Sequence, residues 1–248
     1  MYKKQFDWLK DRFPSKRPAL PENYKRIYED EYKRNRGDHK NLSNLKHKLE
    51  AWMHSYVGRN NGPKGAVLEL GAGTLNHFSF EKEAEAYDIV EPFTALYIDK
   101  PELVKLRSVF YDINEIPSSQ SYSKIFSIAA LEHIEDLGYV IAKSALLLND
   151  DGVMTHGIPS EGGALWYCAW KFGTGTEFRM RTGLPYAPLM HHEHINNAQE
   201  IVRVISIFFS EVSVKRFPLN WIHGSLYTGI YARKPKKQLA LEFLNLCQ

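Results

Sequence analysis

The feature that most constrains this chain is a short apolar run that ends in a Gly-x-Gly turn. Residues 66–70 (AVLEL) have the pattern of a buried strand, and the turn of residues 71–74 (GAGT) follows at once. A second apolar run, residues 87–90, ends at Glu91, eighteen positions after Gly73. Glycine lets the backbone approach a ligand where a side chain would collide. A carboxylate at the tip of the second strand can accept hydrogen bonds from both hydroxyls of a ribose. The pattern therefore predicts a nucleoside-binding site.

A tight strand-to-helix turn can use glycine for steric reasons alone, so the acidic residue carries much of this inference. The dinucleotide-binding version of the motif has a third glycine, three positions after the second. This sequence has Asn76 there. The turn is therefore not suited to close approach of a pyrophosphate, which argues against NAD and for a nucleoside without phosphates.

Three segments resemble, in their order and spacing, the motifs of class I S-adenosylmethionine (SAM) methyltransferases. The first is LELGAGT with the acidic strand end that follows it. Residues 110–117 (FYDINEIP) are similar to the segment that contacts adenine, and residues 127–136 (SIAALEHIED) are similar to the fourth strand and its L-E-H end. The resemblance covers residues 64–233. It implies SAM as the cofactor, bound by Glu69, Gly71, Ala72, Gly73, Thr74, Asn76, Glu91, Pro92, Asp112, Ile113, Ser127 and Ala129.

Strand and helix patterns alternate through the main part of the chain. The predicted strands are 66–70, 87–91, 108–111, 124–130, 152–157, 212–217 and 225–232. One predicted helix begins at about residue 76, and a helical stretch covers 94–106 with an interruption at Pro101. Further helices are predicted at 137–148, 198–209 and 239–246. Alternation of this kind predicts a parallel sheet with helices on both faces. We expect an α/β fold: a doubly wound, mostly parallel seven-stranded sheet whose last strand is antiparallel, as the resemblance also implies.

The first 63 residues are expected to form a helical extension before a SAM-binding methyltransferase domain at 64–248. Residues 22–36 place tyrosines at helical spacing, and a second helix is expected at 42–56. The breaker Asn-Asn-Gly-Pro at 60–63 marks the boundary. The resemblance implies that such helices fold over the cofactor site and supply part of the acceptor pocket. An aromatic stripe that only packs against the core is the alternative.

Charge is distributed unevenly along the sequence. Residues 1–60 hold 15 Lys and Arg against 8 Asp and Glu, while the whole chain holds 32 against 29. A basic segment can attract an anionic substrate, or can simply form solvated helix faces. Cys168 and Cys247 lack the spacing of a metal or redox motif, and we expect Cys168 to be a small core residue. With no signal peptide and no apolar run of ~20 residues, the sequence favours a cytoplasmic protein without membrane contact.

Methyl transfer from a sulfonium is an in-line displacement, so much of its rate comes from positioning. A hydroxyl acceptor also benefits from a general base, and histidine has a suitable pKa. The candidates are His133, which can equally be structural, and His191 and His194 of the H-H-E-H segment. As a strand, this segment would place His192 and His194 on one face, with Glu193 pointing away. No further ligand is obvious, so we expect no metal.

An insertion at residues 159–195 is expected to form the acceptor side of the site. Its aromatic and basic side chains could support a sugar or base and grip a phosphate. The alternatives are loop packing and ordinary surface charge. Together with two tyrosines of the N-terminal extension, the candidate substrate-binding residues are Tyr28, Tyr32, Trp166, Lys171, Arg179, Arg181 and His192.

Residues 131–218 are similar to bacterial methyltransferases associated with surface-polysaccharide synthesis. The sequence is therefore interpreted as a SAM-dependent O-methyltransferase in capsule or lipopolysaccharide synthesis. Its small polar acceptor would be a sugar, a nucleotide-linked sugar, or an anionic phosphate or phosphoramidate group. An RNA methyltransferase and a non-catalytic SAM-binding module are alternatives. The chain lacks an [N/D]-P-P-[Y/F] motif and a recognisable RNA-binding module, which argues against nucleic acid. The sequence leaves open whether the protein forms a homodimer.

Overall fold

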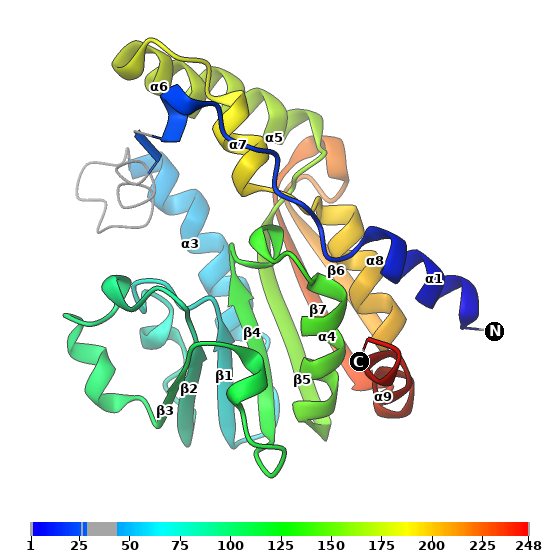
Figure 1. The fold of residues 1–248 in the computed structure, drawn as a ribbon. Helices are drawn as coiled ribbons and strands as arrows, with labels where there is room; N and C mark the ends of the chain where they lie inside the picture. The colour runs from blue at the N-terminus through cyan, green and yellow to red at the C-terminus, as the bar shows by residue number, and fades with distance from the viewer. Residues whose placement is uncertain (1, 26, 29–43, 248) are drawn as a thin grey trace.

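The computed structural model describes residues 2–25, 27–28 and 44–247, and its centre is a seven-stranded sheet (Figure 1). The strands are β1 (Ala66–Leu70), β2 (Ala86–Val90), β3 (Ser108–Phe110), β4 (Tyr122–Ile128), β5 (Leu148–Pro159), β6 (Phe209–Pro218) and β7 (Ser225–Pro235). Their order is β3-β2-β1-β4-β5-β7-β6. Strands β1 to β5 pair in parallel, and β7 lies antiparallel between β5 and β6. The predicted α/β fold with an antiparallel closing hairpin is confirmed.

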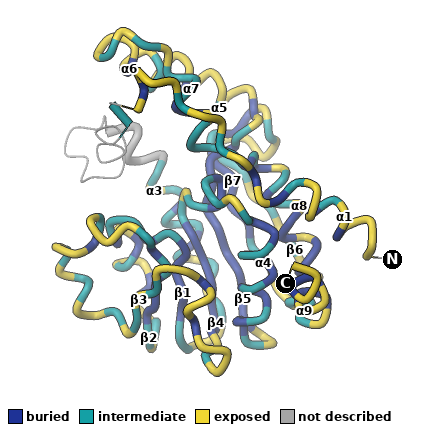
Figure 2. Tube along the Cα trace, in the orientation of Figure 1, coloured by how far each residue is buried: buried dark blue, intermediate teal, exposed yellow. Residues whose placement is uncertain are grey.

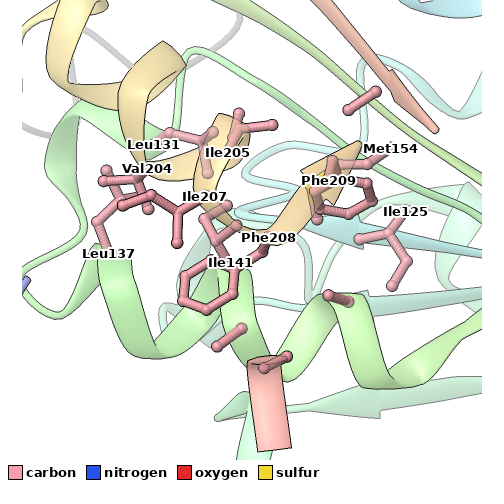
Figure 3. Packing of buried hydrophobic residues seen from close by; sticks show 14 of the residues in the cluster. Ile125, Leu131, Leu137, Ile141, Met154, Val204, Ile205, Ile207, Phe208 and Phe209 are labelled. Atoms are coloured by element: carbon pink, nitrogen blue, oxygen red, sulfur yellow. The ribbon is translucent and has the colours of Figure 1, made fainter. Parts of the chain in front are cut away.

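One face of the sheet is covered by four helices: α1 (Lys3–Arg12), α4 (Leu137–Leu147), α8 (Ala198–Phe208) and α9 (Lys237–Asn245). Helix α8 shows why. Its buried residues Ile201, Val204, Ile205 and Phe208 recur at the helical period and form one apolar stripe. Figure 3 shows Val204, Ile205 and Phe208 of this stripe in one cluster with Ile141 of α4 and Ile125 of β4. The main hydrophobic core therefore lies between these helices and the sheet.

The opposite face is covered by α3 (Asn44–Arg59), from the N-terminal extension. Val57 of α3 is fully buried in a second core with Ile89 of β2 and Phe126 of β4. Trp52 stacks on Phe217 of β6, with ring centroids 5.5 Å apart. Helix α3 is thus packed along the sheet itself.

No α-helix forms after residue 76, and the helical stretch predicted at 94–106 is present only as two short 3-10 segments divided before Pro101. The structure has only 3-10 turns there, at Phe78–Phe80, Thr94–Leu96 and Pro101–Lys105. Pro101 has no N–H group to donate and starts a new turn, so a helix cannot continue through it. In the first segment, His77 and Glu81 are buried and bond to each other. Lys124 of β4 also donates to Glu81, so this segment is held by a contact with the sheet as well.

Residues 159–195 form an arm of α5 (Ala164–Ala169), a π-helical segment (Trp170–Thr174), α6 (Gly175–Thr182) and α7 (Ala187–Glu193). Figure 1 shows the arm across the edge where the parallel strands end, and Figure 2 shows its outer side exposed. The predicted burial of Cys168 is wrong, because it lies on this exposed side of α5. The H-H-E-H segment does not form a strand, since α7 extends to Glu193.

The N-terminal chain runs from α1 through an extended segment to the arm. Residues 22–25 and 27–28 are helical, and Tyr24 packs with Phe178 and Leu189 of the arm. The rest of the helix predicted at 22–36, including Tyr32, lies outside the described residues. Among the helices that the structure describes, none is long and apolar enough to cross a bilayer.

Candidate active site

The glycine turn follows β1 at the edge where the parallel strands end. Gly71 and Gly73 have φ angles of +69° and +53°, in the left-handed region that favours glycine. A Cβ on Gly71 would lie 2.7 Å from the Cβ of Ala130, which follows β4. A Cβ on Gly73 would meet nothing within 4 Å. This side of the turn therefore offers bare backbone, with open space beside it.

Glu91 follows β2, and its carboxylate is turned toward the glycine turn. Its Oε2 accepts the Gly73 N–H at 2.8 Å, and its Oε1 accepts the Phe93 N–H at 2.9 Å. The register that pairs Leu70 with Val90 brings the turn and this carboxylate to one level. Each carboxylate oxygen keeps a further acceptor position. Glu91 can therefore accept hydrogen bonds from the hydroxyl groups of a ligand beside the turn.

Glu69 lies within β1, and its side chain is buried under the turn. Its Oε2 accepts the Tyr87 hydroxyl at 2.6 Å. Burial raises the pKa of Glu69 to about 8, against the hydrogen bond from Tyr87, and the charges of Glu81 and Glu91 add to the rise. Lys124 opposes the rise. Glu69 is therefore a mostly protonated acid at neutral pH.

The other predicted cofactor residues lie at or near the ends of β1 to β4. Asp112 is exposed after β3, and its Oδ1 accepts the Asn114 N–H at 2.8 Å. Ala129 is exposed after β4 with a φ of +49°, a conformation that is uncommon outside glycine. Ser127 is fully buried inside the sheet, with its Oγ 2.7 Å from Nδ1 of His156. The rest are Ala72, Thr74, Asn76, Pro92 and Ile113.

Two of the three candidate bases lie side by side. The rings of His133 and His194 are 4.9 Å apart between centroids, edge to face. His133 Nδ1 donates to the Glu193 carbonyl at 2.8 Å, and His194 Nδ1 donates to Glu161 Oε2 at 3.1 Å. Trp166 donates to the same Glu161 oxygen at 2.5 Å. Because both rings use Nδ1–H, Nε2 is the basic nitrogen of each neutral imidazole.

Carboxylates surround this histidine pair. Glu193 Oε2 lies 3.4 Å from His133 Nδ1, and Glu132 Oε1 lies 3.9 Å from His133 Nε2. Burial would lower the pKa of His194. The hydrogen bond to Glu161 and the charges of Glu132, Glu161 and Glu193 outweigh burial and raise it. A histidine oriented by a carboxylate in this way can accept a proton from a hydroxyl group.

The sequence predictions include none of these three carboxylates. Glu193 is expected to point away because its segment reads as a strand, but α7 ends at this residue. Glu132 lies inside the L-E-H segment, and Glu161 begins the arm. Their nearness in sequence to predicted residues is the signal that could have indicated Glu132 and Glu193. Glu161 meets His194 only through the tertiary fold.

Two further substrate candidates contact each other at the edge of this cluster. The Tyr28 hydroxyl donates to the Glu193 carboxylate. The Tyr28 ring meets His192 edge-on, with centroids 5.3 Å apart. His191 is exposed and packs on Trp170, 6.3 Å away between centroids. The structure thus joins Tyr28 to the histidine pair through Glu193, and it places His191 against the arm.

The three basic candidates lie on the exposed surface of the arm. Lys171 donates to the Tyr167 hydroxyl at 2.7 Å, and Arg181 lies 5.5 Å from the centre of the Phe178 ring. Arg179 is exposed on α6. The described contacts of Lys171 and Arg181 are thus with aromatic rings of their own arm. Within the described ranges, no three His, Cys, Asp or Glu side chains form a group that could hold a metal.

No family model and no curated protein matches this sequence. Solved structures match its fold. One is a SAM-dependent methyltransferase, possible histamine N-methyltransferase, from Thermotoga maritima: 14% identity, TM-score 0.56, covering 86% of this chain and 98% of that chain. Another is the N-methyltransferase NodS from Bradyrhizobium japonicum with S-adenosyl-L-homocysteine: 11% identity, TM-score 0.55, covering 83% and 97%. The DhpI–SAM–HEP complex has 10% identity and a TM-score of 0.54, covering 87% and 100%. The chain therefore has the fold of class I SAM-dependent methyltransferases.

Proposed function

We propose that this protein binds SAM and transfers its methyl group to a hydroxyl of a small polar acceptor. The observation that carries the proposal is the contact between Glu91 and Gly73, at the end of two parallel strands. A left-handed turn with open space beside it suits a nucleoside, and a carboxylate at the same level suits the ribose hydroxyls. The fold that the chain shares with SAM-dependent methyltransferases supports this choice of ligand.

The residues that would hold the cofactor are those of the glycine turn, Glu91, and the strand ends at Asp112 and Ala129. When bound, SAM supplies an electrophilic methyl group on a sulfonium. The protein has to hold an acceptor in line with that group and exclude water. The left-handed Ala129 and the loop that carries His133 follow the same strand end, β4, so the acceptor would meet the histidine pair there.

The histidine pair favours an oxygen acceptor. A neutral hydroxyl has to lose its proton as it attacks, and His194 is oriented and made more basic by Glu161. His133 has the same tautomer but a carbonyl as its main partner. We therefore assign the general base to His194 and a supporting position to His133.

Glu132, Glu161 and Glu193 also bear on the choice of acceptor. Three carboxylates near the base repel an anionic group, and Lys171 and Arg181 of the arm contact aromatic neighbours. We therefore favour the hydroxyl of a sugar, free or nucleotide-linked, over a phosphate or phosphoramidate oxygen. The ring centroids of Trp166 and His194 are 6.3 Å apart, so Trp166 offers an aromatic face for a sugar ring beside the base. Synthesis of a surface polysaccharide is one setting for this reaction.

Titration calorimetry with S-adenosyl-L-homocysteine tests the proposal without a known acceptor. Wild type should bind it and not NAD. A ligand at ~100 times its Kd should also stabilise the fold by about 2.7 kcal/mol. Glu91→Gln should weaken binding by roughly tenfold or more, since it removes a charged acceptor. Glu83→Gln, which changes an exposed carboxylate before β2, is the control and should bind normally. If wild type shows no binding at millimolar ligand, the proposal fails.

A further inference from the structure

Arg17 contacts both loops that carry the paired histidines. It lies in the extended segment after α1, and its Nη2 donates to the His133 carbonyl at 2.6 Å. Its Nη1 donates to the His192 carbonyl at 2.9 Å and, at 3.4 Å, to the Glu193 carbonyl. Its Nε donates to Glu135 Oε1 at 3.0 Å. One guanidinium therefore bridges the loop after β4 and the end of α7, 60 positions apart in the sequence.

Neighbouring residues of the same N-terminal segment support this bridge. The Ser15 N–H donates to the Glu135 carbonyl at 2.8 Å, and His192 Nδ1 donates to the Pro18 carbonyl at 2.7 Å. The Tyr28 hydroxyl donates to the Glu193 carboxylate. The segment thus holds the two loops at several points, and Arg17 is the point at which one side chain binds both.

The hydrogen bond that sets the tautomer of His133 lies between the two groups that Arg17 holds. His133 Nδ1 donates to the Glu193 carbonyl, while Arg17 binds the backbone carbonyls of residues 133, 192 and 193. Any change in the spacing of these carbonyls changes the geometry of that bond. The planar, five-donor guanidinium can serve several carbonyls at once, which an ammonium group on a flexible stem does less well.

We propose that Arg17 is a positioning residue that locks His133 in the Nδ1–H tautomer by fixing the His133 loop against the end of α7. The catalytic value of this lock rests on the proposed methyltransferase function, but the lock itself does not. With Arg17 removed, the carbonyl of Glu193 loses one of the donors that hold it, and the His133 ring can exchange between its two tautomers.

Side-chain ¹⁵N NMR of the histidines tests the lock directly, because the two ring nitrogens differ in shift between tautomers. The His133 signal is assigned by its loss in His133→Gln. Wild type should show a single Nδ1–H tautomer. Arg17→Ala should show averaged shifts, and Arg17→Lys should fall between the two. If both variants keep the wild-type shifts, the proposal is overturned. If Arg17→Ala does not fold, Arg17→Lys decides alone.

A matched control separates positioning from a general loosening of the N-terminal segment. The Arg203 guanidinium lies 3.7 Å from the centre of the Trp8 ring and holds α1 against α8. Arg203→Ala should lower the melting temperature but leave the His133 shifts unchanged. Shifts that average equally in Arg203→Ala would reduce Arg17 to a structural residue and overturn the proposal.

Calorimetry with S-adenosyl-L-homocysteine keeps this proposal separate from the proposed function. Arg17→Ala should bind it as tightly as wild type, since its described contacts are with the histidine loops and not with the glycine turn. If wild type fails to bind, the proposed function fails while the tautomer result stands by itself. If binding is normal and the tautomer is unaffected, only the assignment to Arg17 fails.

Discussion

Lys124 and Glu81 form an ion pair inside the protein, with Lys124 Nζ 2.5 Å from Glu81 Oε1 and side-chain exposures of 2% and 5%. The same ammonium donates to the Val57 carbonyl at 2.9 Å, and so ties β4 to α3. Glu81 Oε1 also accepts from His77 Nε2 at 3.0 Å, which leaves His77 Nδ1 to accept from His54 Nδ1 at 3.0 Å. This buried network links α3 to the segment that follows the glycine turn.

Removing one partner of this pair should strongly destabilise the fold. Burial opposes the charge of Lys124 and lowers its pKa, and Glu81 counteracts the effect. Lys124→Met would leave the Glu81 carboxylate buried without its cation. We expect a loss of about 3–5 kcal/mol in the free energy of unfolding, measured by urea denaturation. Lys64→Met, at an exposed site before β1, should change it by less than ~0.5 kcal/mol. Equal stabilities of the two variants would contradict the role of the network.

Glu69 should make stability depend on pH between about 5 and 8. Its pKa is about 8 in the folded protein, mainly through burial, and near 4.5 when unfolded. Between pH 4.5 and about 8 the folded state keeps a proton on Glu69 that the unfolded state has lost. The free energy of unfolding is therefore greatest below pH 4.5 and falls as the pH rises through this range. The slope from this group is at most ~1.4 kcal/mol per pH unit. Glu69→Gln should lose that slope in urea denaturation across this range. A wild-type curve that is flat over this range, and parallel to that of the variant, would show that Glu69 is ionised when folded.

Much of the sheet could be predicted from the sequence, because its strands are short apolar runs with clear ends. The first strand is found at Ala66–Leu70, as expected, and β1 to β5 pair in parallel, as the alternation of strands and helices predicts. The two missing helices could not be predicted from spacing. Glu81, the partner of His77, is held by Lys124, which comes 43 positions after Glu81, and α3 packs against the 3-10 turn in this segment.

The candidate site likewise has one contact that the sequence spacing predicts and others that only the tertiary fold creates. The spacing of Gly73 and Glu91 indicates a contact because both follow adjacent parallel strands, and their atoms meet at 2.8 Å. The partners of the histidines lack such a local pattern. Glu161 reaches His194 from 33 positions away and Arg17 reaches His133 from 116. Contacts of this kind depend on how the arm and the N-terminal segment fold back over the strand ends.

His156 should reduce stability at acid pH. It is fully buried in β5, and burial lowers its pKa to about 3, against 6.5 in an exposed histidine. Below 6.5 the unfolded state gains a proton that the folded state does not take up. Stability therefore falls as pH drops from about 6.5 to about 3, by at most ~1.4 kcal/mol per unit. His156→Gln keeps an acceptor for the Ser127 hydroxyl and should be less sensitive to acid in thermal melts. A variant as sensitive as wild type would assign the acid effect to other groups.

The two glycines of the turn should respond differently to alanine. Gly73→Ala places a methyl group in open space, so only the left-handed φ opposes it, at a cost of about 1–2 kcal/mol. That methyl would occupy the ligand side of the turn, and binding of S-adenosyl-L-homocysteine should fall sharply in calorimetry. Gly71→Ala adds a clash with Ala130 at 2.7 Å and should be less stable than Gly73→Ala. Gly173→Ala, also in open space but on the arm, should bind normally. Normal binding by a folded Gly73→Ala would mean that the ligand does not lie against this turn, and the proposed cofactor site would have to be abandoned.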